Sequence, residues 1–327
     1  MSAPVLSVRN LSLRIGNIVP VHDLSFDVNA GEVLGIVGES GSGKSLTLRA
    51  ILRLLPRGVQ TSGNILWRGC DLMRLGEPAL RALRGEEIAI VFQEPMTALD
   101  PVLSIGRQIT ESLAEHLGLR GRSARSRAVE LLDIVGIPDA RQRLSSYPHE
   151  FSGGMRQRAM LAIALAGGPK LLLADEPTTA LDVTIQDQIL KLLLRLRREL
   201  SMSIVLVTHD LGIVAETCDR VAVLYSGRMM ETGPVETVLT RPAHPYTLGL
   251  INSVPQARQA RQHLAAIPGA PPDPYVLPPG CRFAPRCTLA SPDCLKGLPE
   301  LRPLATDHAT ACLHPDAVMR RELNLAS

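Results

Sequence analysis

The chain has 327 residues, of which 45% are hydrophobic and 20% are charged, and its formal net charge is +3. This length and apolar content can build one large core or two smaller ones. The small net charge and an aromatic content of 3% argue against a nucleic-acid-binding protein, which needs a strong basic field or rings that stack on bases.

The N-terminus lacks the basic start, apolar core and small-residue cleavage site of a signal peptide. No window reaches the roughly 18–20 uninterrupted apolar residues of a membrane span. The nearest window, residues 159–177, is broken by Gly167, Gly168, Pro169 and Lys170. We therefore expect a cytosolic chain that acts at a membrane only through partner chains.

A glycine-rich loop is the most informative segment. An apolar run at residues 33–37 predicts a buried strand before it, and a helical pattern follows it. Its glycines let backbone N–H groups close around phosphate oxygens. We expect its lysine to bind the β- and γ-phosphates of ATP and its last serine to bind Mg²⁺. The loop fits the pattern G-x-x-x-x-G-K-[ST] in full, with Gly38, Glu39, Ser40, Gly41, Ser42, Gly43, Lys44 and Ser45.

Two further strands are predicted to lead into polar residues. Residues 171–174 are apolar and are followed by Asp175 and Glu176. We expect Asp175 in the Mg²⁺ shell, and Glu176 is a candidate general base that orients or deprotonates a water molecule. Residues 203–210 predict a strand that ends at His209, which we expect to contact the γ-phosphate.

The ordered set of motifs resembles the ATP-binding cassette (ABC) family, over residues from Val5 to about Val254. The signature motif departs from the usual pattern, with phenylalanine and methionine in place of leucine and glutamine around its Ser-Gly-Gly core. The matching residues are Gln93 of the glutamine loop, Ser152, Gly153 and Gly154 of the signature motif, Ala180, Leu181 and Asp182 of the D-loop, and His209 as the switch histidine.

This resemblance implies a mechanism in which two ATPase subunits face each other head to tail. Residues 152–154 and Asp182 of one subunit would then act on the ATP that the other holds. Gln93 is implied to contact Mg²⁺ or the attacking water, and to act in catalysis with Glu176 and His209. A helical subdomain is implied at about residues 93–159. The aromatic residue that stacks on adenine in the family is replaced by Ile15 near its usual place.

Several stretches resemble the oligopeptide and dipeptide importer branch of this family: "FQEPMTALDP", "YPHEFSGGM", "ADEPTTALDVTIQ" and "RPAHPYTLGL". The branch implies an ATPase subunit that energises uptake of di- and oligopeptides. Its implied partners are a paralogous ATPase in a heterodimer, two transmembrane permease subunits and an extracytoplasmic substrate-binding protein, with no nucleic acid. It would lie peripherally on the cytoplasmic face of the inner membrane. The alternatives are an importer of nickel complexes or glycosides, and a soluble ABC ATPase without a transport role.

Four cysteines follow in a proline-rich tail, at Cys281, Cys287, Cys294 and Cys312. In a reducing compartment, such a set is more often a metal site than a pair of disulfides. The gaps of five, six and seventeen residues are wider than the C-x-x-C pairs of zinc sites, which favours a 4Fe–4S cluster. The resemblance to the importer branch points the same way.

Zn²⁺, with His308 or His314 as substitute ligands, and the absence of any metal are the alternatives. We expect the tail to act as a structural clamp against the ATPase partner, with redox sensing as a second hypothesis. Outside the tail, Cys70 and Cys218 are isolated and are predicted to be small buried hydrophobic residues.

The predicted fold is α/β: a P-loop NTPase (RecA-like) ABC nucleotide-binding domain with an antiparallel edge sheet, an inserted helical subdomain and a cysteine-rich C-terminal tail. The predicted division places the ATPase domain at residues 1–254, a linker at 255–275 and the metal-binding region at 276–327.

Overall fold

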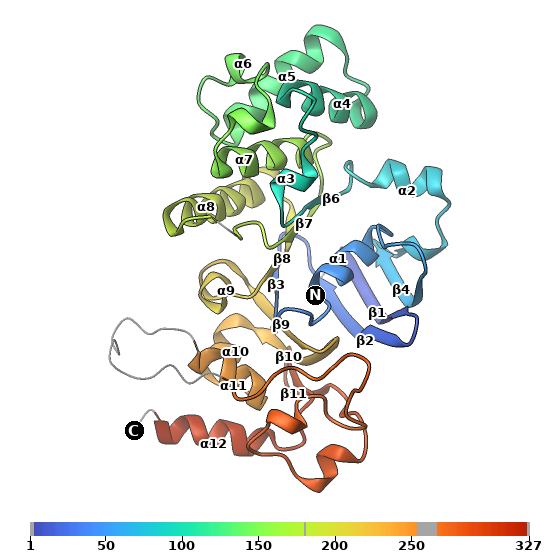
Figure 1. Cartoon of the computed structure of the whole chain (residues 1–327), viewed down its shortest axis with the longest axis vertical. Helices are drawn as coiled ribbons and strands as arrows, with labels where there is room; N and C mark the ends of the chain where they lie inside the picture. The colour runs from blue at the N-terminus through green and yellow to red at the C-terminus, as the bar shows by residue number, and fades with distance from the viewer. Residues whose placement is uncertain (1–2, 180, 254–266, 326–327) are drawn as a thin grey trace.

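The computed structural model of the chain describes residues 3–179, 181–253 and 267–325. Figure 1 shows a central sheet with a helical part at one end and the C-terminal region at the other, and an antiparallel sheet at its side. This arrangement confirms the predicted fold, an α/β phosphate-loop core with an antiparallel sheet.

The central sheet carries the predicted ATP site. Its strand order is β11-β12-β10-β9-β3-β8-β7-β6, and β9, β3, β8, β7 and β6 are parallel. Because ligands bind at the carboxyl ends of such strands, the residues after β3, β7 and β8 meet at one edge. The strands are β3 (Val33–Val37), β6 (Ile88–Val91), β7 (Leu171–Asp175), β8 (Ser203–Thr208), β9 (Arg220–Tyr225), β10 (Arg228–Pro234), β11 (Arg302–Ala305) and β12 (His308–Thr310).

The antiparallel sheet has the order β2-β1-β4-β5. Apolar side chains such as Leu11, Leu13 and Val21 are fully buried in the core between this sheet and the central one. The sheet also places the strand β2 next to the phosphate loop. Its strands are β1 (Leu6–Ile15), β2 (Ile18–Val28), β4 (Val59–Trp67) and β5 (Cys70–Asp71).

The prediction that both isolated cysteines are buried is wrong for Cys70, which is exposed. Cys70 begins β5 and pairs with Trp67 of β4 across a tight turn, at the free edge of the antiparallel sheet, which leaves the residue exposed. Cys218 lies at the end of α9 and approaches Gly35 of the central sheet. Burial raises the pKa of its thiol to about 12.

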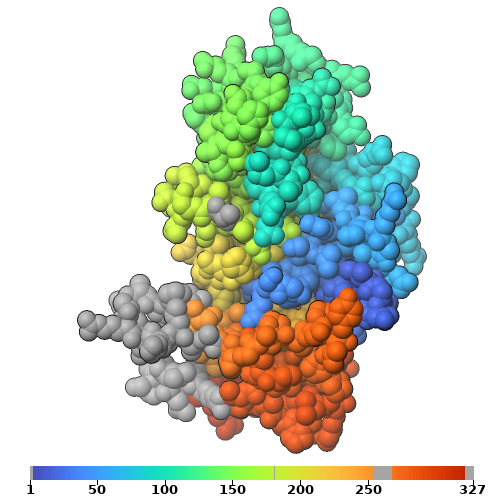
Figure 2. All heavy atoms as spheres, viewed as in Figure 1, coloured from blue at the N-terminus to red at the C-terminus, as the bar shows by residue number. Residues whose placement is uncertain are grey.

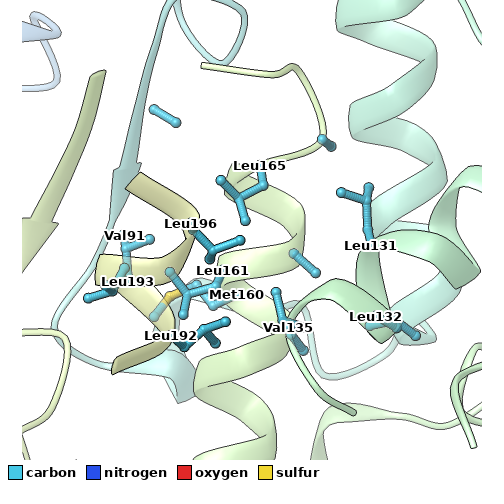
Figure 3. Close-up of a cluster of buried hydrophobic side chains, with 14 of the residues drawn as sticks. Val91, Leu131, Leu132, Val135, Met160, Leu161, Leu165, Leu192, Leu193 and Leu196 are labelled. Carbon is cyan, nitrogen blue, oxygen red and sulfur yellow. The ribbon is translucent and has the colours of Figure 1, made fainter. Parts of the chain in front are cut away.

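Helices cover the central sheet and form the part at its β6 end. Figure 3 shows Val135, which directly follows α5, close to Met160 of α7 and Leu192 of α8, in the core that joins this part to the sheet. The helices are α1 (Lys44–Ile51), α2 (Glu77–Leu83), α3 (Pro95–Ala98), α4 (Ile105–Leu117), α5 (Gly121–Ile134), α6 (Ala140–Arg143), α7 (Gly153–Ala164), α8 (Val183–Leu200), α9 (Leu211–Thr217), α10 (Val235–Thr240), α11 (Pro245–Asn252) and α12 (Pro315–Leu325). In the described part of the chain, none of them has the length and apolarity that a membrane crossing requires.

The C-terminal region is attached directly to the central sheet. Strand β12 pairs antiparallel with β10, and β11 pairs with β12. The ring of Phe283 lies 5.3 Å from the rings of Tyr225 and Tyr246, which are 4.6 Å apart. Such aromatic contacts add to the apolar area that they bury. The predicted division between the ATPase domain, the linker and the tail stays a prediction, because most of the linker, residues 255–266, lies outside the described residues.

A buried carboxylate also holds the C-terminal region in place. Glu231 of β10 is fully buried and accepts hydrogen bonds from the backbone N–H groups of Ala243, at 2.7 Å, and His244, at 3.0 Å. Nε2 of His308 in β12 lies 2.9 Å from the same carboxylate. Glu231 therefore joins β10, the start of α11 and the tail through one set of hydrogen bonds.

We expect Glu231→Ala to lower the free energy of unfolding by about 2–4 kcal/mol, because it leaves three buried donors without their acceptor. Urea unfolding of the purified chain measures this. The matched control is Glu236→Ala, in an exposed position on α10, for which we expect a change within about 0.5 kcal/mol. Equal destabilisation by the two substitutions would contradict the proposed role of Glu231.

Candidate nucleotide site

The phosphate loop runs from the end of β3 to the start of α1, as the sequence predicts. Gly43 has a φ of +93°, and a Cβ atom there would lie 2.6 Å from the carbonyl oxygen of Pro20. A Cβ atom on Gly38 would overlap the carbonyl oxygen of Leu224. Glycine is therefore required at both positions by close packing as well as by backbone conformation.

Lys44 begins α1 and is almost completely buried. Its Nζ donates hydrogen bonds to the carbonyl oxygens of Gly38, at 2.8 Å, and Glu39, at 3.0 Å. Burial lowers the pKa of the ammonium group, and the carboxylates of Glu176 and Asp175 oppose this effect. The Lys44 ammonium group is thus bound to carbonyl oxygens of its own loop. The oxygens of a phosphate can replace these carbonyl oxygens as its hydrogen-bond acceptors.

Ser45 and Asp175 come together although 130 positions separate them in the sequence. The Ser45 hydroxyl donates a hydrogen bond of 2.8 Å to Oδ1 of Asp175, which ends β7 and is 1% exposed. Burial raises the pKa of this carboxyl group, and the hydrogen bond from Ser45 opposes the rise. The Ser45 hydroxyl and the buried Asp175 carboxylate are two oxygen ligands next to each other. This pair fits Mg²⁺, which takes one or two protein ligands together with phosphates and water.

Glu176 is the point where the other candidate catalytic residues meet. Its Oε2 accepts hydrogen bonds from Nε2 of Gln93, at 3.3 Å, and from the hydroxyl of Thr179, at 2.8 Å. Nδ1 of His209 lies 3.2 Å from the same oxygen. The predicted strand at residues 203–210 ends at Thr208, so His209 lies just beyond it. The sequence prediction did not include Thr179, whose only signal is its position three residues after Glu176.

The signature residues lie apart from this group. Ser152 and Gly153 are exposed, and Ser152 caps α7 by accepting a hydrogen bond of 3.4 Å from the N–H of Met155. A Cβ atom on Gly154 would lie 2.7 Å from Cγ2 of Ile185 in α8, so glycine is needed there for close helix packing. Within the described residues, no hydrogen bond joins residues 152–154 to the phosphate loop of the same chain.

The predicted D-loop residues precede α8. The carboxylate of Asp182 accepts a hydrogen bond of 2.9 Å from the N–H of Ile185 and so caps this helix. The next residue, Val183, is 83% exposed. Ala180 lies outside the described residues. Ile15, predicted near adenine, is at the end of β1 and is 37% exposed.

The C-terminal region contacts the phosphate loop directly, which sequence reasoning missed. Arg286 donates hydrogen bonds of 2.7 and 3.0 Å to the two carboxylate oxygens of Glu39. The hydroxyl of Tyr246 accepts a hydrogen bond of 2.9 Å from the N–H of Glu39. Since Glu39 and Arg286 are 247 positions apart, no local pattern indicates the pair. Figure 2 shows the C-terminal region, in orange, against the N-terminal residues in blue.

Comparison with known proteins supports this description. The model of the ABC transporter family matches residues 21–179. The model of the oligopeptide/dipeptide transporter C-terminal region matches residues 230–294. The chain is also similar to a Brucella abortus protein named as a peptide import ATP-binding protein, with 52% identity over 316 residues and 95% of each chain covered.

A second relative is the oligopeptide transport ATP-binding protein OppD of Haemophilus influenzae, 48% identical over 295 residues that cover 89% of this chain and 91% of that one. Among solved structures, a dimeric ATP-binding cassette in a post-hydrolysis state, bound to ADP and phosphate, superposes with a TM-score of 0.63 and 28% identity. The superposition covers 70% of this chain and 98% of the dimeric cassette's chain. CbiO1 of Clostridium perfringens, part of an ABC transporter complex, gives a TM-score of 0.63 at 29% identity, over 72% of this chain and 91% of that one.

Two glycines of the phosphate loop give a test of its packing. Gly41 and Gly43 both have positive φ, but a Cβ atom on Gly41 meets nothing within 4 Å. We expect Gly41→Ala to cost about 1–2 kcal/mol of stability from backbone strain alone. Gly43→Ala should cost about 1–3 kcal/mol more, because the new methyl group meets the backbone of β2. Urea unfolding compares them, and equal values would contradict the role of this contact.

Proposed function

The chain belongs to the ABC transporter ATPases of the oligopeptide and dipeptide import branch, and from this membership we propose how its residues use ATP. It is the ATPase subunit of a peptide importer, in which ATP hydrolysis drives transport. The finer proposals below concern the roles of individual residues, the partner chains and the C-terminal cysteines.

We propose that the phosphate loop binds the β- and γ-phosphates of ATP through its backbone N–H groups and Lys44. The chemistry of the donors supports this, because the loop offers N–H groups at a helix start and a buried ammonium group. Ser45 and Asp175 would hold Mg²⁺, whose charge offsets that of the phosphates. Burial raises the pKa of Asp175, and a bound Mg²⁺ would oppose this rise, because a cation favours the ionised carboxylate.

We propose that Glu176 is the general base and that Gln93 and His209 position the water and the γ-phosphate. The observation that carries this proposal is the meeting of Gln93, Thr179 and His209 on one oxygen of Glu176, next to the Ser45–Asp175 pair. A carboxylate held by three groups has a fixed orientation, which a base needs in order to act on a water at a defined place.

A second ATPase subunit completes the site in this proposal. The signature residues Ser152 and Gly153 are exposed at the start of a helix, where N–H groups attract an anion. In the described part of the chain, no hydrogen bond joins residues 152–154 to their own phosphate loop. The neighbouring Val183 is an exposed apolar side chain next to Asp182, which suits a surface covered by another subunit. We propose a paralogous ATPase as this partner, in a head-to-tail heterodimer.

Two transmembrane permease subunits and an extracytoplasmic substrate-binding protein would complete the importer, with di- and oligopeptides as substrates. Met96 and Val102, which follow Gln93 in the helical part, are 55% and 76% exposed. Exposed apolar side chains this close to the catalytic glutamine suit a surface through which a permease reaches the ATP site. The chain would lie peripherally on the cytoplasmic face of the inner membrane.

We propose that the four tail cysteines hold a 4Fe–4S cluster, which would serve as a structural support or, as a second hypothesis, in redox sensing. Their side chains line one small cavity, together with His244 and His314. Backbone N–H groups point at the sulfurs: Leu289 donates to Cys287 and His314 donates to Cys312, each at 3.3 Å. Such N–H donors stabilise metal-bound thiolates.

The fit to a single ion is poorer. Within the described residues, no three His, Cys, Asp or Glu side chains are close enough together to hold one metal ion. His308, a substitute zinc ligand in the sequence prediction, is instead buried against Glu231. Burial raises the pKa of Cys312 to about 12, and the other cysteines add to the rise. The thiol of Cys312 therefore becomes a thiolate ligand only where the positive charge of a bound metal offsets this rise in its pKa.

We expect Glu176→Gln to lower the rate of ATP hydrolysis by about 10²–10⁴-fold, because the amide cannot accept a proton. The affinity for ATP should stay the same, since the amide keeps the shape of the side chain. Hydrolysis is measured on the assembled transporter and binding by titration of the chain. The control is Glu199→Gln at the exposed end of α8. Hydrolysis at the wild-type rate would exclude Glu176 as the base.

Metal analysis of anaerobically purified chain tests the tail. We expect about four iron atoms and four acid-labile sulfides per chain, with a brown colour. Cys294→Ser should lose the iron, whereas Cys70→Ser, which changes an exposed cysteine that does not line the cavity, should keep it. One zinc and no sulfide would replace the cluster by a zinc staple, and no metal at all would remove both.

A further inference from the structure

A cavity of about 320 Å³ adjoins the phosphate loop. Its walls come from residues 18–20 of β2, residues 39–42 of the phosphate loop, Tyr225 and Ser226 at the end of β9, and residues 271–274 with Leu277 from the C-terminal region. This size is at the lower end of small-molecule sites. Two of the walls are therefore far apart in sequence: one is near the N-terminus, and the other runs from the end of the predicted linker into the predicted metal-binding region.

We propose that residues 271–277 of the C-terminal region form an outer wall of the nucleoside site, so that the ribose and base of ATP pack against them in this cavity. The inference rests on the proposed function, in which the phosphate loop holds the phosphates. Residues 39–42 belong to both the loop and the cavity. The nucleoside of ATP can therefore lie in the cavity while its phosphates stay bound to the loop.

The chemistry of the walls suits a nucleoside. Ile18, Val19 and Leu277 offer branched aliphatic side chains, and Pro271 and Pro272 offer compact saturated rings. Such groups pack on the faces of an uncharged base without requiring hydrogen bonds. Polar groups are few, and the carboxylate of Asp273 and the hydroxyl of Ser226 are available for the ribose or for base nitrogens.

No aromatic ring is free to stack on the base among the residues that line this cavity. The ring of Tyr225 is 1% exposed and is packed against Tyr246 and Phe283. Tyr275 is 76% exposed and does not line the cavity. Ile15, predicted to take the place of the stacking residue, is also outside the lining, whereas Ile18 and Val19 belong to it. Aliphatic residues and prolines thus replace the aromatic contact.

Arg286 fixes the outer wall to the phosphate loop. Its guanidinium group donates to the carbonyl oxygen of Pro268, at 2.9 Å, and to that of Ile267, at 3.3 Å, just before the wall begins. The same group pairs with both carboxylate oxygens of Glu39 in the loop. One buried side chain therefore joins the two walls, and the wall itself is stiffened by its prolines.

The wall also has a turn that sets its shape. The carboxylate of Asp273 accepts a hydrogen bond of 2.9 Å from the N–H of Tyr275, and the carbonyl oxygen of Asp273 accepts one of 2.9 Å from Val276. This turn directs Leu277 back toward the loop, while Val276 is 75% exposed and outside the lining. Because the wall is formed before ATP arrives, little conformational entropy is lost on binding.

The test compares ATP with inorganic tripolyphosphate, which has the phosphates without the nucleoside. The dissociation constants of both, with Mg²⁺, are measured by calorimetry on the full chain and on its Leu277→Ala variant. We expect Leu277→Ala to weaken ATP binding about 5-fold or more, because it removes apolar contact with the nucleoside, and to leave tripolyphosphate binding unchanged. Leu277→Met, which keeps the apolar volume, should restore ATP binding.

Val276→Ala is the matched control, since it truncates the neighbouring side chain outside the cavity, and we expect no change. Three results would overturn the proposal: unchanged ATP binding by Leu277→Ala, an equal loss of ATP and tripolyphosphate binding, or an equal effect of Val276→Ala. Lys44→Ala separates this inference from the proposed function. If that variant binds both ligands as wild type does, the phosphate loop is not the ATP site, and the proposed function fails with it.

Discussion

The phosphate loop can follow its path only because two of its residues have no side chain. Gly38, directly after β3, packs against the backbone of Leu224 in β9, and Gly43 packs against that of Pro20 in β2, so the central and the antiparallel sheets hold the loop from two sides. This packing sets the direction of the first turn of α1, and with it the positions of Lys44 and Ser45. Every other group that we assign to the ATP site is placed relative to this loop.

In the structure each catalytic group already has a partner in the chain. Lys44 donates to carbonyl groups of its own loop, Ser45 donates to Asp175, and Glu176 accepts from Gln93 and its neighbours. ATP and Mg²⁺ must therefore exchange these hydrogen bonds for new ones rather than add to them. The net gain from each exchange is small, so the larger part of the driving force has to come from opposite charges and from apolar contact with the nucleoside.

The sequence predicts the groups of the site that follow a buried strand and misses those that depend on distant packing. The glycine loop, Asp175 and Glu176 follow apolar runs of about five residues, which fix where they lie in a parallel sheet. The pair of Glu39 and Arg286 leaves no such trace, because its partners are 247 positions apart. Strands β11 and β12 were not predicted either, since they have four and three residues and β11 is exposed throughout.

Arg286 connects the C-terminal region to the phosphate loop of the same chain. A tail that served only to hold a partner subunit would not need this contact. Arg286 precedes Cys287 directly, and its buried guanidinium group bridges the cysteine region and Glu39 of the phosphate loop. Burying a guanidinium group is costly unless a carboxylate and further acceptors surround it, and Glu39 and the carbonyl groups of Ile267 and Pro268 supply them. These partners come from both ends of the chain. The loop and the tail therefore stabilise each other, and loss of order in the cysteine region removes a support from the loop that carries the phosphates.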